Sequence, residues 1–331
     1  MKKVLVIFGG NSYEHYVSCK SAKSIIENLD KKLFDYELVG IHFDNKWYQF
    51  NGELSYLENG HWKDTNVTAI DNIIDYIQKF DVVFPMIHGY SGEDGKLQGM
   101  LELFNIPFVG CNTLASAISM DKEMSKIVFE HFAIPQVPYL IYEENKQKEI
   151  EERIGFPVIV KPANGGSSIG IGKAENKKQL KKAIKEAKQY DSKIIIEKFI
   201  TARELECAVL EKNKRIICSN LGEIKSANEI YDYNAKYINE KSYTIIPQDL
   251  PIEVVNQIQE YARKIFLGFH CNGYARIDFF YEEESRQIYI NEMNTIPGFT
   301  SISMYPKLME HEGISYTDLL TILINSANSS R

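Results

Sequence analysis

Short apolar runs alternate with amphipathic stretches along the first third of the chain. The runs at 4–8, 36–43, 82–87 and 106–110 are typical of buried strands, and helical periodicity falls between them at 18–29, 70–77 and 97–104. This strand–helix rhythm predicts an α/β fold whose first sheet is parallel and doubly wound. We expect one long helix at 112–132, capped by Asn112 or Thr113 and ending before Pro135.

The rest of the chain has the pattern of two further units. Residues 134–197 hold a strand (PVIVKP), a Gly/Ser loop (ANGGSSIGIGK, residues 163–173), a Lys-rich amphipathic helix at 177–189 and a second strand (KIIIEKF). Beyond residue 200 come the strands LECAVL and RIICSN, a helix at 253–267, two more apolar strands and two closing helices. We therefore expect domains at 1–115, 116–198 and 199–331, with α+β character after the first.

Composition excludes several classes of function. The 331 residues carry 38 Lys and Arg against 45 Asp and Glu, a net charge of −7, so we expect no nucleic-acid partner. Since no apolar run approaches about 18 residues, we expect no membrane span, and the N-terminal run is too short for a signal peptide. The five cysteines are scattered without CxxC pairs, which favours reduced thiols and a cytoplasmic location.

Two apolar strands near the C-terminus carry charged residues at alternate positions. Arg276 and Asp278 share one face of YARIDFFY, and Glu292 and Asn294 share one face of IYINEMN. If the strands pair, one face presents a cation, two carboxylates and an amide oxygen, a donor set that suits Mg²⁺ or Mn²⁺ better than zinc. An edge hairpin with its charges in water is the alternative, but the polar loop that follows at 295–301 favours a metal site.

A glycine- and serine-rich loop follows the buried strand VIVKP. Its small residues would let backbone N–H groups close around phosphate oxygens, with Lys161 supplying charge. The loop is not a P-loop, because Ile171 stands where that motif needs Lys, and it precedes no helix as the dinucleotide fingerprint requires. A plain β-hairpin turn is the alternative, but a lysine that ends a buried strand needs a partner, which favours a phosphate site.

Three other polar segments are candidates only in combination. Glu14 follows FGGNS and His88 opens HGYSGEDGKLQG, both at strand ends of the first sheet, where open α/β sheets bind ligands. Taken alone, Glu14 would be an ordinary helix-start carboxylate, and His88 is equally suited to a structural hydrogen bond. The third segment, EKFI at 197–200 with Glu204 beyond it, could offer backbone groups to an adenine edge and a carboxylate to ribose hydroxyls.

Taken together, these segments resemble the D-alanine–D-alanine ligase family of the ATP-grasp superfamily. The resemblance runs in order along nearly the whole chain through GGNSYEHYVS, HGYSGEDGKLQG, MDKEMSK, VIVKPANGGSSIG, IIIEKF, YDYNAKY, ARIDFF and NEMNTIPGFTS. It implies an N-terminal α/β domain followed by a two-domain ATP-grasp fold, with ATP held between the latter two domains.

The resemblance also implies a role for each candidate residue. The residues expected at ATP are Lys122, Lys161, the loop residues Gly166, Ser167 and Ser168, then Glu197, Lys198, Ile200, Glu204 and Lys236. Those expected at two Mg²⁺ or Mn²⁺ ions are Asp278, Glu292 and Asn294. At the first amino acid, Glu14 is expected to bind the ammonium and to be linked by hydrogen bonds to Ser167 and Tyr237. At the second, His88 is expected nearby, Ser303 at the carboxylate and Met304 at the side chain. Arg276 and the Gly298 N–H are expected at the oxyanion.

The implied activity is ATP-dependent joining of two D-alanines through D-alanyl phosphate, for peptidoglycan synthesis, in a cytoplasmic homodimer. A ligase that adds D-serine or D-lactate second is the alternative within the family. Tyr at position 237 is usual in relatives that add D-alanine, and the apolar Met304 suits a methyl side chain. Two alternatives outside the D-alanine–D-alanine ligase family are a catalytically silent ATP-grasp module and a nicotinamide oxidoreductase. The first is disfavoured because Arg276, Asp278, Glu292 and Asn294 are all present. The second is disfavoured because the glycine fingerprint of dinucleotide-binding folds is missing.

Overall fold

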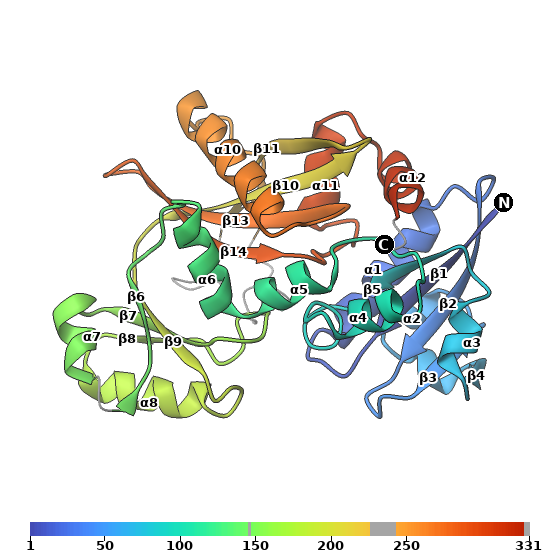
Figure 1. Cartoon of the computed structure of the whole chain (residues 1–331), viewed down its shortest axis with the longest axis horizontal. Helices are drawn as coiled ribbons and strands as arrows, with labels where there is room; N and C mark the ends of the chain where they lie inside the picture. The colour runs from blue at the N-terminus through green and yellow to red at the C-terminus, as the bar shows by residue number, and fades with distance from the viewer. Residues whose placement is uncertain (145–146, 226–242, 328–331) are drawn as a thin grey trace.

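A computed structural model of the chain describes residues 1–144, 147–225 and 243–327. Three sheets organise these residues, with strand orders β4-β3-β2-β1-β5, β6-β9-β7-β8 and β12-β11-β10-β13-β14. Each sheet carries its own helices, and the chain passes through them in sequence (Figure 1). Within the described ranges, no helix combines the length and apolar character needed to cross a membrane.

The first sheet is only partly parallel. Its strands are β1 (Lys2–Gly9), β2 (Phe34–Ile41), β3 (Trp47–Phe50), β4 (Val67–Ala69) and β5 (Val82–Met86). β1 pairs in parallel with β2 and β5, as the sequence predicts, whereas β3 and β4 add an antiparallel edge that it does not. The strand expected at 106–110 is wrong, because that segment makes only an isolated bridge between Phe108 and Val83.

Successive side chains of β1 point to opposite faces of the first sheet, and the two faces pack against different parts of the chain. Val4, Val6 and Phe8 pack with α1 (His15–Asn28) and with the closing helices α11 (Met304–His311) and α12 (Tyr316–Ser326). Leu5 and Ile7 pack on the other face with α3 (Ile73–Ile77) and α4 (Lys96–Leu103). The two ends of the chain therefore share one hydrophobic core, and α12 lies beside α1 in Figure 1.

The single helix expected at 112–132 is in fact two helices. α5 (Thr113–Met120) is capped by Asn112, whose side chain accepts from the N–H of Ala115, as predicted. The helix then breaks at Asp121, whose extended backbone (φ −89°, ψ 103°) lets its carboxylate accept from the N–H groups of Glu123 and Met124. Asp121 thus starts a new helix, α6 (Lys122–His131), in a different direction.

The central sheet is antiparallel and small. β6 (Tyr139–Ile141), β7 (Val158–Pro162), β8 (Gly172–Ala174) and β9 (Ile194–Lys198) form it, with α7 (Gln147–Arg153) and α8 (Lys177–Ala187) on one side. α8 is the Lys-rich helix of the sequence analysis, two residues shorter than expected. Its apolar stripe packs on the inward side chains of β7 and β9.

The third sheet is also antiparallel and carries the charged strands. β10 (Arg203–Lys212), β11 (Arg215–Lys225), β12 (Tyr243–Ile245), β13 (Tyr274–Glu282) and β14 (Gln287–Asn294) form it, and α10 (Ile252–Gly268) packs against it. The short α2 (Ser55–Glu58) and a 3₁₀ turn at Trp62–Asp64 complete the helices of the first unit. As expected, β13 and β14 pair, with Asp278 opposite Glu292 and Arg276 opposite Asn294.

We expect Gly40→Ala to destabilise the first core. A Cβ at Gly40 would lie 2.5 Å from the ring of Trp62 and 2.9 Å from that of Phe8, and both rings are fully buried. Overpacking of this kind costs about 1–3 kcal/mol, so the thermal unfolding midpoint should fall. Gly99→Ala is the matched control: its Cβ would be 3.6 Å from its nearest neighbour, and alanine is the better helix former. Equal midpoints for the two variants would contradict this packing.

Candidate active site

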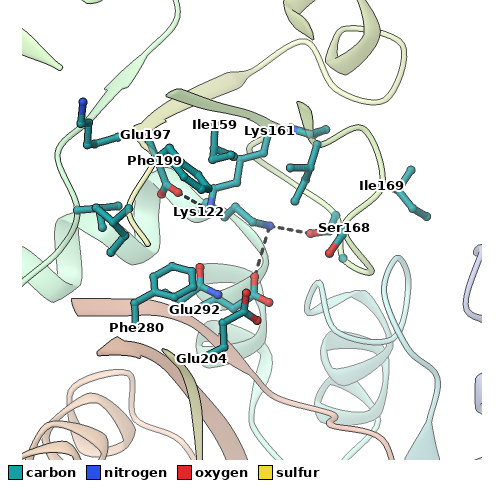
Figure 2. A pocket seen from close by; sticks show the side chains of 18 of the residues that line it. Lys122, Ile159, Lys161, Ser168, Ile169, Glu197, Phe199, Glu204, Phe280 and Glu292 are labelled. Atoms are coloured by element: carbon teal, nitrogen blue, oxygen red, sulfur yellow. Dashed lines mark hydrogen bonds and ion pairs between the residues drawn. The ribbon is translucent and has the colours of Figure 1, made fainter. Parts of the chain in front are cut away.

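A cavity of about 310 Å³ opens between the central and third sheets. β7, the Gly/Ser loop, the segment after β9 and the edge of β13–β14 line it (Figure 2). All the nucleotide residues expected from the sequence within the described ranges line this one cavity: Lys122, Lys161, Gly166, Ser167, Ser168, Glu197, Lys198, Ile200 and Glu204. Glu292 of the expected metal set lines it too. Lys236 and Tyr237 lie outside the described residues.

Apolar side chains that the sequence analysis did not single out form the walls of the cavity. Ile159 and Phe199 lie on one side in Figure 2 and Phe280 on the other. Strand alternation contains the signal for two of them, since Ile159 is two residues before Lys161 and Phe280 is two after Asp278. The arrangement suits a flat aromatic ring between two apolar surfaces.

The Glu197 carboxylate lies between two lysines. Lys161 Nζ is 2.6 Å from Oε2 and Lys126 Nζ is 2.8 Å from Oε1, and all three side chains are buried. Burial alone would raise the pKa of Glu197, but the two cations outweigh it and lower that pKa to about 2. The carboxylate is therefore ionised at neutral pH. Lys126 was missed by the sequence analysis, although it lies one helical turn after Lys122 on α6.

The Gly/Ser loop bends back over the cavity and reaches the first sheet. Ser167 (φ 52°) and Ser168 (φ 56°) adopt left-handed backbone conformations next to Gly165, whose carbonyl accepts from Lys122 Nζ at 2.7 Å. Ser167 Oγ donates to Glu14 Oε1 at 2.5 Å, the link that the resemblance implied. A Cβ at Gly89 would lie 2.8 Å from Glu14 Oε2, so a larger residue there would crowd this carboxylate.

A row of charged residues crosses the third sheet beside the cavity. Arg276 donates to both oxygens of Asp278, at 2.8 and 2.7 Å, and its Nε is 3.2 Å from Glu206 on the neighbouring strand. Asn294 Nδ2 donates to Asp278 Oδ2 at 2.8 Å. Glu292, opposite Asp278, lies 3.9 Å from Lys122 Nζ. Arg276, which we expect at the oxyanion, is thus hydrogen-bonded to Asp278, which we expect to bind a metal ion.

The chemistry of this donor set fits a hard divalent cation. Asp278, Glu292 and Asn294 offer carboxylate and amide oxygens from directly facing strands, without sulfur or imidazole. In the part of the chain that the structure describes, no cluster of three or more His, Cys, Asp or Glu side chains is positioned to hold a metal. The expected metal ligands are of a different kind, because Asp278 and Glu292 supply two carboxylates and Asn294 supplies an amide.

The HGYSGEDGKLQG segment connects the first sheet to the loop after β14. His88 Nδ1 donates to the carbonyl of Ile296 at 2.9 Å, and its Nε2 accepts from Ser21 Oγ at 3.2 Å. Burial lowers the pKa of His88, so the ring is neutral in this position. Glu93 accepts from the N–H groups of Gly89 and Ile296, both at 2.9 Å. The sequence analysis quoted Glu93 within the motif but gave it no role.

Much of this motif maintains its own loop. Gln98 Nε2 donates to the carbonyl of Gly92 at 2.6 Å, and Asp94 accepts from the N–H groups of Ser91 and Lys96. A Cβ at Gly92 would lie 1.9 Å from the Ile87 carbonyl oxygen, so only glycine fits there.

The expected second-substrate residues lie where β14 leads into α11. A Cβ at Gly298 would lie 2.7 Å from Ser303 Oγ, so backbone and hydroxyl are close neighbours. Ser303 Oγ accepts from the Thr300 N–H at 3.0 Å. Met304 is 5% exposed, and its sulfur would lie 2.3 Å from a Cβ at Gly222. The Met304 side chain packs against β11, and its place at an acceptor substrate stays a prediction.

The fold and the cavity between two antiparallel sheets define an ATP-grasp ligase. Family models described as D-ala D-ala ligase N-terminus and C-terminus match residues 3–111 and 128–325, and the chain belongs to this family. It is 46% identical to a D-alanine--D-alanine ligase of Acetivibrio thermocellus, over 98% of this chain and 96% of that one.

Solved structures agree with the family and its ATP-grasp fold. The VanG D-Ala:D-Ser ligase from Enterococcus faecalis superposes with a TM-score of 0.88 at 36% identity, covering 98% of each chain. The D-alanine-D-alanine ligase from Coxiella burnetii gives 0.84 at 32% identity, covering 99% of this chain and 95% of that one. The resemblance noted in the sequence is confirmed, as is the expected fold class.

We expect Glu93→Gln to change how stability depends on pH. Burial, with a contribution from Glu14, raises the pKa of Glu93 from 4.5 to about 8, against the two backbone N–H groups. A raised pKa means that the folded state holds its proton longer than the unfolded state. The stability that the protonated carboxyl contributes is complete below pH 4.5 and is lost as pH rises toward 8.

The measurement is urea unfolding of both proteins at several pH values. The stability of the wild type relative to Glu93→Gln should decline between pH 4.5 and 8, because glutamine cannot ionise. A difference that stays constant over that window would contradict the raised pKa.

Proposed function

We propose that this protein joins two D-alanine molecules in an ATP-dependent reaction through D-alanyl phosphate, giving D-alanyl-D-alanine, ADP and phosphate. The observation that carries the proposal is the hydrogen bond from Ser167 to Glu14. It connects the loop that covers the nucleotide-sized cavity with the carboxylate suited to the ammonium of an amino acid. The name of the 46% identical relative supports the same reaction.

The cavity residues would divide the nucleotide between them. Lys122 and Lys161 are the cations for the triphosphate, and the N–H groups of Gly166, Ser167 and Ser168 are its donors. Glu197, Lys198 and Ile200 follow one another along an extended segment suited to the adenine edge, and Glu204 is suited to ribose hydroxyls. Ile159 and Phe280 would enclose the ring from opposite sides.

Asp278, Glu292 and Asn294 are the residues that would hold Mg²⁺ or Mn²⁺. Such ions, when bound, supply the positive charge that reduces repulsion between a carboxylate and the γ-phosphate. The chain itself orients these ligands, since Arg276 and Asn294 fix both oxygens of Asp278. That two ions bind is what the family resemblance implies.

Glu14 would orient the first D-alanine, so that its carboxylate meets the γ-phosphate. Arg276 and the Gly298 N–H would then stabilise the tetrahedral oxyanion that forms when the second amine attacks the acyl phosphate. Ser303 would receive the second carboxylate, and the neutral His88, fixed between Ser21 and Ile296, would border that site. Exclusion of water from the site would protect the acyl phosphate from hydrolysis.

A second candidate is the D-alanine–D-serine ligase reaction. The VanG D-Ala:D-Ser ligase from Enterococcus faecalis has the same fold. Relatives 41–46% identical over nearly the whole chain are named D-alanine--D-alanine ligase, which supports the first reaction over this one. A cytoplasmic homodimer remains our expectation for the assembly.

We expect Glu292→Gln to lower turnover by at least about two orders of magnitude. The change keeps the shape but removes one negative charge from the proposed metal site, where charge stabilisation is worth several kcal/mol. ADP release with D-alanine at saturating Mg²⁺ measures it. Glu284→Gln is the matched control, because Glu284 is exposed in the turn between β13 and β14. Near-normal turnover of Glu292→Gln would refute the metal assignment.

In competition we expect D-alanine to be preferred over D-serine as second substrate by about 10- to 100-fold in kcat/KM. The apolar Met304, at its proposed place beside the acceptor, offers no hydrogen-bond partner to a serine hydroxyl. Burying a hydroxyl without a partner costs roughly 1–3 kcal/mol. We expect D-lactate to be inert near neutral pH. Mass spectrometry of the products from an equimolar mixture measures the ratio. Equal incorporation of D-serine and D-alanine would instead support the second candidate function.

A further inference from the structure

Two lysines hold Glu197, but only one of them borders the cavity. Lys161 lines the cavity from the end of β7, whereas Lys126 reaches the other carboxylate oxygen from α6. Lys126 is 2% exposed and its Nζ lies 4.7 Å from the ring of Tyr139 on β6. Its ammonium is therefore enclosed by protein on the side of Glu197 that faces away from a ligand.

The two lysines would have different binding partners once a nucleotide is bound. Lys161 is a proposed phosphate ligand, and a single ammonium that moves to a triphosphate gives up its short contact with Glu197. A buried carboxylate that loses its only cation is strongly destabilised. Lys126 removes that difficulty because it lies 2.8 Å from Oε1, the other carboxylate oxygen, and would keep this contact when Lys161 binds phosphate.

An ionised carboxylate accepts hydrogen bonds and cannot donate them. With its orientation fixed from behind, Glu197 would favour a purine whose edge presents an amino donor and would disfavour one that presents a carbonyl oxygen. The charge state and position of this one carboxylate would therefore decide which base is accepted.

We propose that Lys126 is a positioning residue for nucleotide selection: it fixes the Glu197 carboxylate from outside the cavity, and thereby both selects a 6-aminopurine and leaves Lys161 available for the triphosphate. This inference rests on the proposed ATP-dependent function and deepens it. Lys126 acts only through Glu197 and Lys161, since it is not among the residues that line the cavity.

The test compares ATP with ITP, which carries a carbonyl oxygen where ATP has its 6-amino group. Lys126→Met should lower kcat/KM for ATP by about 10- to 100-fold, mainly through KM, since hydrogen bonds to charged groups are worth that factor. The loss in kcat/KM with ITP should be smaller, so the ratio of kcat/KM for ATP to kcat/KM for ITP, the ATP/ITP preference, should decrease. Lys126→Arg retains the charge and should preserve more of the preference than Lys126→Met.

Lys193→Met is the matched control for a purely structural effect. Lys193 bonds Asp121 and Glu123 at the start of α6, at 2.6 and 2.8 Å, but does not contact Glu197. Its loss should weaken the same helix without changing the ATP/ITP preference. A folded Lys126→Met protein with the wild-type preference would overturn the inference.

Two further variants keep the test decisive if Lys126→Met does not fold. Lys126→Gln removes the charge but retains a polar group, and it should narrow the preference in the same direction. Glu197→Gln should narrow it too, and adding Lys126→Gln to Glu197→Gln should cause little further loss; additive losses would contradict action through Glu197.

Failure of the proposed function would be recognised separately. If the wild type forms no dipeptide from D-alanine with either nucleotide, the proposed function fails, and calorimetric binding of ATP and ITP then tests Lys126 alone. If the wild type forms dipeptide but no Lys126 variant changes the preference, only the inference about Lys126 fails.

Discussion

A set of buried polar contacts joins the first sheet to the loop after β14, and the candidate site depends on it. Ile296 donates to Glu93 and accepts from His88, while the Phe299 N–H donates to Ser21 Oγ at 3.3 Å. These backbone groups have no strand partner, so without the side chains they would be buried at a cost of about 1–3 kcal/mol each. Ser21, His88 and Glu93 of the first unit thus supply the hydrogen-bond partners that the loop after β14 needs.

This junction brings residues from opposite ends of the chain to one candidate site. Phe8 of β1 and Phe299 of the loop lie in the same hydrophobic core as α11 and α12, so the apolar contacts and the polar contacts fix the same arrangement. Glu14 and Gly298 both extend from this rigid base. The Gly/Ser loop is linked to the first unit by the hydrogen bond from Ser167 to Glu14 and by the one from the Tyr90 hydroxyl to the Asn164 carbonyl.

Sequence patterns predicted most of the site because its residues alternate along strands or follow strand ends. Arg276, Asp278 and Glu292 were located in this way, and their facing positions on β13 and β14 are confirmed. Lys126 and Glu93 were not predicted because each contacts a residue that is distant in sequence. Local hydrophobic or polar periodicity contains no information about such contacts. Nor did the local pattern show that Met304 packs in the core shared by the first sheet and α12.

The fold showed the same division between local and long-range information. β1, β2 and β5 contain apolar runs and were recognised, whereas the short strands β3 and β4 were not, because they depend on antiparallel pairing beside β2. The break between α5 and α6 was missed because no Gly or Pro marks it. Asp121 makes it by capping a second helix within one continuous amphipathic pattern.

The central claim is that the chain activates a carboxylate as an acyl phosphate at this junction, and isotope transfer tests it most directly. D-Alanine labelled with ¹⁸O in both carboxylate oxygens should give phosphate that carries one labelled oxygen for every dipeptide formed, because one carboxylate oxygen leaves with the phosphoryl group. The other labelled oxygen should remain in the peptide carbonyl. Unlabelled phosphate, or label recovered in AMP, would contradict the account.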